Sequence, residues 1–263
     1  MRDLHVERRE LSGEIVEVWT IDREEVRNAL SRSLVRAIGE AARRVETDRE
    51  VRGVVLTGRG DRSFCAGADL KERRGMSEAE VRDFLAMYRT EFRFLDRLSK
   101  PVVAAIQGVA FGGGLELALT CDFRVAAPHA EMGLTEVSLA IIPGAGGTQR
   151  LTHLVGPAVA KELLLTSRRL SAEEALRLGI VNRVAREGQS AVEAALEFLE
   201  PMVTKAPIAV AAALEAVDAA VDQTLEEGLV TELRLYERTL VSRDRLEALA
   251  AFAEKRPPRF EGR

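Results

Sequence analysis

Strand-like and helix-like patterns alternate through the first 190 residues of this chain. Residues 27–48 have helical spacing through Leu30, Leu34 and Ile38. Alternating or continuously apolar segments typical of strands occur at residues 14–21, 51–58, 101–108 and 122–127. We therefore expect an α/β body of roughly 190 residues.

Two sequence signals mark where helices begin. Ser77 is followed by Glu80, and Ser171 by Glu174, which is the spacing of a capping box. Both pairs precede helical patterns, so we expect helices to begin at about residues 78 and 172.

The strand patterns stop near residue 190, and the remaining sequence is almost wholly helical, interrupted by Pro201 and Pro207. We therefore expect residues 1–195 to form the body and residues 196–263 a helical appendage. Such an alanine-rich appendage either packs on another subunit or covers the core of its own chain.

Composition excludes several classes of function. The chain of 263 residues has 38 Lys and Arg against 42 Asp and Glu, a net charge of −4, which argues against nonspecific binding to nucleic acid or anionic membranes. Cys65 and Cys121 lack metal-ligand spacing and indicate reduced thiols in an intracellular protein. The three histidines, His5, His129 and His153, are scattered, so we expect neither a metal site nor a cofactor.

The N-terminus lacks the apolar segment of a signal peptide, and no run of eighteen apolar residues occurs. We therefore expect a cytoplasmic protein without membrane insertion.

Glu116 and Glu136 each stand in a glycine-punctuated and otherwise apolar stretch, GGGLELAL at 112–119 and MGLTEVSLAIIPGAGG at 132–147. Apolar surroundings raise the pKa of a carboxyl group toward neutral pH, which suits a general acid or base. The alternative is that each glutamate lies on the solvated face of a helix. Their shared apolar surroundings favour a site that adds or removes a proton and a water.

Glycine-rich turns supply backbone donors near these acids. In FCAGADLKER (64–73), Gly67 allows a sharp turn and the small neighbours leave amide groups uncovered, although an ordinary strand-to-helix turn has the same composition. In AFGGGLELAL (110–119) the glycines open a helix whose first N–H groups are free. Two such donors on one carbonyl oxygen would form an oxyanion hole suited to enolate chemistry.

Four separated motifs resemble the crotonase (enoyl-CoA hydratase/isomerase) superfamily over nearly the whole chain, and their residues are most similar to those of its methylglutaconyl-CoA hydratase branch. They are FCAGADLKER, GGGLELALTCDFRVAA, AEMGLTEVSLAIIPGAGGTQRL and AFAEKRPPRF. The resemblance implies a spiral of ββα repeats followed by helices that assemble trimers, which usually stack as a dimer of trimers.

The resemblance also implies roles for individual residues. The amides of Ala68 and Gly113 would hold the thioester oxygen, Glu116 would act as the base on water, and Glu136 would deliver the proton to Cα. Coenzyme A would enter as part of the substrate. Further contacts to substrate or coenzyme A are expected from Arg27, Ala29, Ala66, Asp69, Leu70, Lys71, Gly112, Pro143, Gly144, Phe252 and Lys255. Phe252 and Lys255 match positions that reach a neighbouring subunit's coenzyme A in relatives, whereas Arg27 is equally well explained as a surface cation.

The sequence says less about which acyl group the substrate carries. A methylglutaconyl group ends in a carboxylate, for which Arg73, Arg74 and Arg82 are candidate partners, although exposed helix cations explain them equally well. Alternatives are a general crotonyl-CoA hydratase, an isomerase, which usually manages with one glutamate, a decarboxylase, and a non-catalytic scaffold.

RNA binding is a further alternative, because the animal member of this branch binds AU-rich RNA through a lysine-rich helix. The matching helix here carries Arg32 and Arg36 but then Glu40. With a negative net charge, nucleic-acid binding is not favoured.

Overall fold

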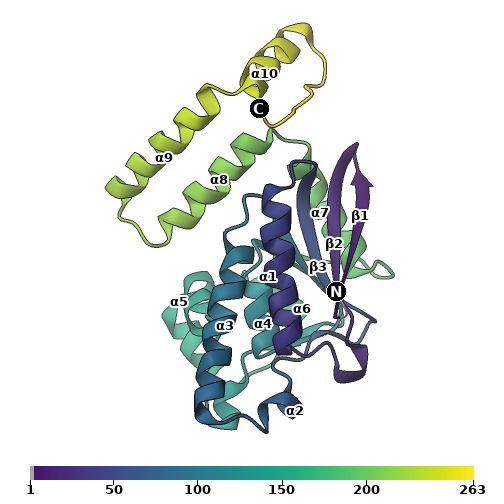
Figure 1. Cartoon of the computed structure of the whole chain (residues 1–263), viewed down its shortest axis with the longest axis vertical. Coiled ribbons are helices and arrows are strands. Elements are labelled where there is room, and N and C mark those ends of the chain that lie inside the picture. Colours follow the sequence, from purple (N-terminus) through teal and green to yellow (C-terminus); the bar gives the residue numbers. More distant parts are fainter. Residues whose placement is uncertain (1–2) are drawn as a thin grey trace.

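The computed structural model describes residues 3–263 and shows a mixed α/β fold with a mostly parallel main sheet (Figure 1). The main sheet has six strands in the order β1 (Leu4–Leu11), β2 (Glu14–Ile21), β3 (Val51–Gly58), β5 (Val102–Ile106), β7 (Phe123–Ala126) and β10 (Arg183–Val184). A smaller sheet has four strands in the order β4 (Ser63–Cys65), β6 (Val109–Phe111), β8 (Glu131–Gly133) and β9 (Leu170–Ser171). The expected α/β fold is confirmed.

Helices follow the strands in a regular order. They are α1 (Arg32–Thr47), α2 (Leu70–Arg73), α3 (Glu78–Asp96), α4 (Gly113–Leu119), α5 (Gly147–Leu165), α6 (Ala172–Arg177), α7 (Ala191–Val203), α8 (Pro207–Ala220), α9 (Leu225–Leu240) and α10 (Arg243–Glu254), with short 3-10 turns η1 (Glu24–Val26) and η2 (Glu136–Leu139). The strand pairs β3–β4, β5–β6 and β7–β8 each place one strand in the main sheet and the next in the smaller sheet, and a helix follows each pair. This order is a spiral of ββα turns.

The predicted strands are confirmed as β2, β3, β5 and β7, and both predicted capping boxes begin their helices, α3 and α6. The helix predicted over residues 27–48 begins later, at Arg32. Arg27 and Asn28 have positive φ angles, and the Ser31 hydroxyl accepts a hydrogen bond from the Leu34 amide as the N-cap. The buried Asn28 amide instead donates to the Ser63 carbonyl, which ties this segment to β4.

The expected boundary at residue 195 falls inside α7, which continues through Pro201 to Val203. The helix packs on β3, β5 and β7 and buries Leu199 completely, so it belongs to the body. The appendage begins at Pro207, the first residue of α8, where proline is well tolerated. Helices α8 and α9 pack on each other and extend with α10 away from the body (Figure 1).

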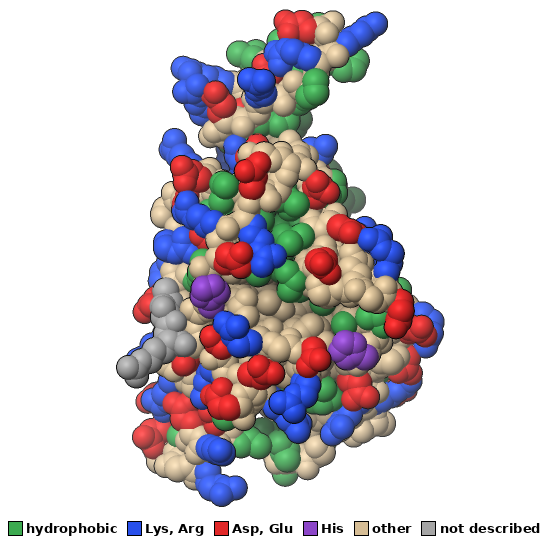
Figure 2. All heavy atoms as spheres, turned by 90° about the vertical axis from the view of Figure 1, so that its right-hand side faces the viewer, with side chains coloured by type: hydrophobic (Ala, Val, Ile, Leu, Met, Phe, Trp, Pro, Cys, Tyr) green, Lys and Arg blue, Asp and Glu red, His purple; other side chains and the backbone are tan. Residues whose placement is uncertain are grey.

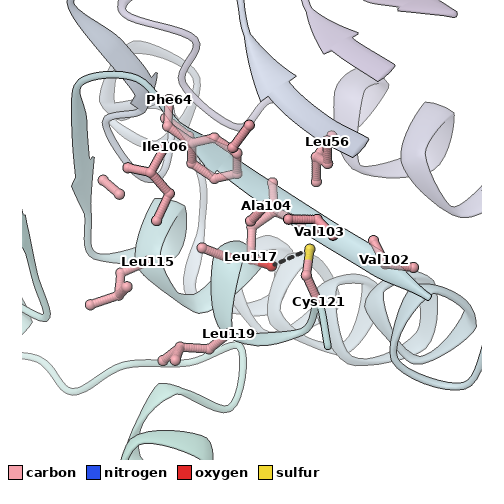
Figure 3. Packing of buried hydrophobic residues seen from close by; sticks show 14 of the residues in the cluster. Leu56, Phe64, Val102, Val103, Ala104, Ile106, Leu115, Leu117, Leu119 and Cys121 are labelled. Carbon is pink, nitrogen blue, oxygen red and sulfur yellow. Dashed lines mark hydrogen bonds between the residues drawn. The ribbon is translucent and has the colours of Figure 1, made fainter. Parts of the chain in front are cut away.

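A buried apolar core holds the loops of the site in place. Figure 3 shows β5 crossing beside α4, with Ala104 and Ile106 of the strand near Leu115 and Leu117 of the helix. These side chains are at most 1% exposed. The buried Cys121 thiol donates to the Leu117 carbonyl at 3.7 Å, and both cysteines are free, as expected. The core therefore fixes α4 against the sheet.

Candidate active site

Two loops from successive turns of the spiral meet at the site. Gly67, after β4, has a φ of +102°, and a Cβ on it would lie 2.9 Å from the Phe111 carbonyl oxygen. A residue with a side chain would be strained at this φ angle, and its Cβ would collide with the neighbouring loop. The glycine therefore lets the loop after β4 lie directly on the loop after β6.

This close approach brings together the two expected oxyanion donors. A Cβ built on Gly113 would lie 3.6 Å from the Ala68 amide nitrogen. Across residues 3–263, neither the Ala68 nor the Gly113 amide donates a hydrogen bond to another group of the protein. Gly113 is also the first residue of α4, whose positive dipole end favours negative charge. The pair can polarise one carbonyl oxygen.

Glu116 lies one turn into α4 and is 3% exposed. Its Oε1 atom accepts hydrogen bonds from the Ala145 amide at 2.7 Å and the Gly147 amide at 2.8 Å. Burial raises the pKa of Glu116, and these amides act in the opposite direction by stabilising the carboxylate. The carboxyl group is thus held in one orientation by the loop that begins α5.

Glu136 begins the turn η2 and is 8% exposed. Burial, and then the charge of Glu116, raise the pKa of Glu136 to about 7, although Arg73 acts in the opposite direction. A Cβ on Gly112, which has a φ of +52°, would lie 3.1 Å from the Glu136 Oε1 atom. The glycine before the oxyanion donor therefore makes room for the second acid.

Several other expected site residues lie in the same loops. Ala66 precedes the turn at Gly67, and its amide donates to the Arg27 carbonyl at 3.1 Å. Pro143 is buried and Gly144 half-buried beside the amides that hold Glu116. Ala29 is 7% exposed.

The carboxylate of Asp69 has partners within the protein. It accepts from the Lys71 and Glu72 amides at the start of α2 and pairs with Arg23 at 2.9 Å. Asp69 therefore caps α2 and positions the loop after Ala68. By contrast, the side chains of Leu70, Lys71 and Arg27 are exposed.

The three arginines proposed for the acyl tip occupy different environments. Arg82 is 71% exposed and pairs with Glu78 one turn earlier on α3, and Arg74 is exposed. Arg73 is half-buried, and its charge acts on both Glu136 and Tyr88. Arg73 is thus less exposed than Arg74 and Arg82 and its charge acts on Glu136, whereas Arg82 lies on the outer surface.

Phe252 and Lys255 lie at the end of α10, which belongs to the projecting helices (Figure 1). Phe252 is 85% exposed. The structure of one chain does not bring them together with the glutamates.

Sequence reasoning missed Tyr88. It lies on α3, is 4% exposed, and its ring stacks on Phe84 with a centroid distance of 4.7 Å. Its hydroxyl has no hydrogen-bond partner in the described residues. The spacing of Phe84, Tyr88 and Phe92 four residues apart was the available signal of a buried aromatic stripe that carries one polar atom.

The surface adds little support for nucleic-acid binding. Figure 2 shows acidic and basic side chains interspersed over one face of the molecule. Arg32 of α1 lies over the Phe84 ring at 5.5 Å from its centroid, so one of the two arginines considered for RNA binding, Arg32 and Arg36, already has an aromatic partner.

Two further observations concern ions and membranes. Within residues 3–263 there is no group of three or more His, Cys, Asp or Glu side chains that could hold a metal ion. None of the helices in this same range is both long and apolar enough to span a bilayer.

Comparison with known proteins agrees with this geometry. The model of the enoyl-CoA hydratase/isomerase family matches residues 12–263. A crystal structure of an enoyl-CoA hydratase from Bacillus anthracis has a TM-score of 0.95 at 44% identity, covering 99% of this chain and 100% of that one. A probable mitochondrial enoyl-CoA hydratase of Arabidopsis thaliana is 44% identical over 94% of this chain and 82% of its own length. Human mitochondrial methylglutaconyl-CoA hydratase is 41% identical over 99% of this chain and 78% of its own length.

The chain belongs to the enoyl-CoA hydratase/isomerase family, the crotonase superfamily. Its activity is that of an enoyl-CoA hydratase, a hydro-lyase that acts on an acyl-CoA substrate.

Proposed function

We propose that this enzyme adds water reversibly to 3-methylglutaconyl-CoA, forming 3-hydroxy-3-methylglutaryl-CoA. The observation that carries the proposal is that Arg73 is half-buried, unlike the exposed Arg74 and Arg82, and that its charge acts on Glu136. A carboxylate at the acyl tip would find a charge-assisted partner there. The 41% identity to the human methylglutaconyl-CoA hydratase supports the same substrate.

In the proposed reaction the Ala68 and Gly113 amides bind the thioester oxygen, which takes up negative charge as the double bond is attacked. Glu116 removes a proton from the water, whose oxygen forms the new bond to Cβ. The electrons of the double bond move to the enolate oxygen and return as Glu136 transfers its proton to Cα. Both acids lie on the same side of the substrate in this scheme, so the addition is syn. Dehydration uses the same groups in reverse.

A general hydratase for crotonyl-CoA is the second candidate, since relatives that are 44% identical to this chain carry only the broader name of enoyl-CoA hydratase. Steady-state kcat/KM values for 3-methylglutaconyl-CoA and crotonyl-CoA distinguish the two. We expect a preference for the first substrate. A preference for crotonyl-CoA would reject the proposed substrate and leave the hydratase activity standing.

The arginine variants sharpen this test. Arg73→Gln should lower kcat/KM for 3-methylglutaconyl-CoA roughly ten- to a hundredfold, because a charged hydrogen-bonded pair is lost. The matched variant Arg82→Gln removes a cation that is paired on the surface, and we expect no change. Equal effects of the two variants on both substrates would show that Arg73 does not contact the acyl tip.

We also propose that α8, α9 and α10 join three copies of the chain, and that two trimers can stack as a hexamer. These helices bury few apolar side chains in one chain, whereas Leu225, Leu233 and Val241 are 62–85% exposed. An apolar surface of this kind is typical of a subunit interface. Leu233→Glu should dissociate the assembly, as measured by light scattering coupled to size exclusion, and a monomeric wild-type protein would contradict the proposal.

A role in leucine breakdown and a cytoplasmic location remain predictions from the sequence.

A further inference from the structure

Two buried polar atoms stand apart from all others in the described part of the chain. Among residues 3–263, only the Tyr88 hydroxyl and the Glu136 Oε2 atom are buried side-chain polar atoms without a hydrogen-bond partner. Folded proteins pair nearly all such groups, so each exception calls for a reason. For Glu136 the reason is its proposed role as the proton donor to substrate.

The same charges act on both atoms. Tyr88 is on α3 and Glu136 on η2, yet Glu116 and Arg73 influence the ionisation of each. Burial raises the pKa of Tyr88, the Cys65 thiol and the Glu116 charge raise it further, and Arg73 acts in the opposite direction. Tyr88 therefore shares the electrostatic surroundings of the catalytic acids and keeps its proton at neutral pH, so that it can donate a hydrogen bond.

The Tyr88 ring is fixed by its neighbours. It stacks on Phe84 and meets Phe92 edge to face, with centroid distances of 4.7 and 5.3 Å. The same helix approaches the loop that holds Glu116, because a Cβ on Gly144 would lie 2.5 Å from the Leu85 Cδ2 atom. Helix α3 thus packs beside that loop, and the two neighbouring rings hold the Tyr88 side chain in a defined place, as a ligand-binding donor requires.

We propose that the Tyr88 hydroxyl donates a hydrogen bond to the carboxylate at the far end of the acyl group, beside Arg73. This inference rests on the proposed function. The thioester oxygen already has two amide donors, and the water has two glutamates. The carboxylate is the remaining acceptor of the acyl group, and Arg73 is the cation whose charge acts on both Tyr88 and Glu136. Tyr88 is therefore a specificity-determining residue.

The test compares Tyr88→Phe with Thr90→Val, which removes an exposed hydroxyl from the same helix. Both variants are assayed as assembled enzyme with 3-methylglutaconyl-CoA and crotonyl-CoA. Tyr88→Phe should lower kcat/KM for the carboxylate substrate roughly ten- to a hundredfold and leave that for crotonyl-CoA unchanged. Thr90→Val should change neither.

Thermal unfolding without substrate gives a second readout. Because the hydroxyl has no hydrogen-bond partner among residues 3–263, Tyr88→Phe should not lower the melting temperature. A lower melting temperature, or equal loss on both substrates, would assign Tyr88 a structural role and overturn the inference. If the wild type prefers 3-methylglutaconyl-CoA and Tyr88→Phe keeps that preference, the inference fails while the proposed function stands. If the wild type prefers crotonyl-CoA, the proposed substrate is rejected, and the inference about Tyr88 is rejected with it.

Discussion

The segments that carry Glu116 and Glu136 are built differently, although both acids are buried in the same site. Glu116 is part of the helix α4, and the loop before α5 supplies two amides to its Oε1 atom. Glu136 is on the short turn η2, and its Oε2 atom has no partner in the described residues. The two amides offset part of the burial effect that raises the pKa of Glu116, whereas the pKa of Glu136 is raised to about 7, so the surroundings of Glu136 favour its protonated form.

This difference suggests how two identical side chains take opposite roles. Glu116, which accepts hydrogen bonds from two backbone amides, is suited to accept a proton from water. Glu136, with a pKa of about 7, can hold the proton that is transferred to Cα. The following predictions test that division.

The largest effect is expected from removing either acid. Glu116→Gln and Glu136→Gln should each lower kcat for hydration by roughly a hundred- to ten-thousandfold, because general acid and base catalysis are lost. A glutamine oxygen at position 116 can still accept from the Ala145 and Gly147 amides, so circular dichroism should show an intact fold. Full activity in either variant would reject the mechanism.

The second prediction concerns pH. Glu136 must be protonated for hydration, so kcat/KM should fall above about pH 7, by about tenfold per pH unit. The enzyme form that dehydrates carries the same single proton, on Glu116 instead of Glu136, and the overall reaction takes up no proton, so kcat/KM for dehydration should fall over the same pH range. Values of kcat/KM measured in both directions between pH 5 and 9 check that the two profiles coincide. Glu136→Gln should lack this inflection, and an unchanged inflection in that variant would assign it to another group.

The third prediction concerns stability. The pKa of Glu136 is higher in the folded protein, about 7 against an ordinary value of 4.5. The folded state therefore binds more protons in this range, and stability falls as pH rises from about 4.5 to 7. Glu136→Gln should stabilise the protein by on the order of 2 kcal/mol at pH 8 and much less at pH 4.5. Melting temperatures at the two pH values, at one protein concentration, measure this difference, and an equal gain at both would contradict it.

The smallest effect is expected at the glycine beside Glu136. Gly112→Ala adds a Cβ at a positive φ and 3.1 Å from the Glu136 Oε1 atom. Gly13→Ala is the matched control, since its φ is also positive but no atom lies within 4 Å of the added Cβ. Both should lose about 1 kcal/mol of stability from backbone strain. Only Gly112→Ala should also lower kcat, and equal activity of the two would show that Glu136 tolerates displacement.

Sequence reasoning succeeded where the signal was local. The capping boxes at Ser77 and Ser171 begin their helices as predicted. In each box the serine hydroxyl accepts a hydrogen bond from the backbone amide of the glutamate three residues later, and the glutamate side chain accepts one from the backbone amide of the serine. It failed at the start of α1, where buried Asn28 bonds the Ser63 carbonyl from a distant strand. It also failed at Pro201, which continues in α7 because that helix packs on the sheet.

The candidate site divides in the same way. The apolar surroundings of Glu116 and Glu136 and the glycines near Ala68 and Gly113 are visible in the sequence. The choice of Arg73 over Arg82, however, depends on distances between α2, α3 and η2, because charge interactions weaken with separation and solvent exposure.

By itself, the sequence determined the α/β fold, the family and the two acids, because hydrophobic period, turn residues and motif spacing are properties of neighbouring residues. The tertiary structure alone decided which carboxyl group receives the amides, that Arg73 is half-buried while Arg82 is exposed, and that the Tyr88 hydroxyl is buried without a partner among the described residues. These are properties of side chains that approach one another from separate turns of the spiral, and burial and hydrogen bonding there depend on the packed chain as a whole.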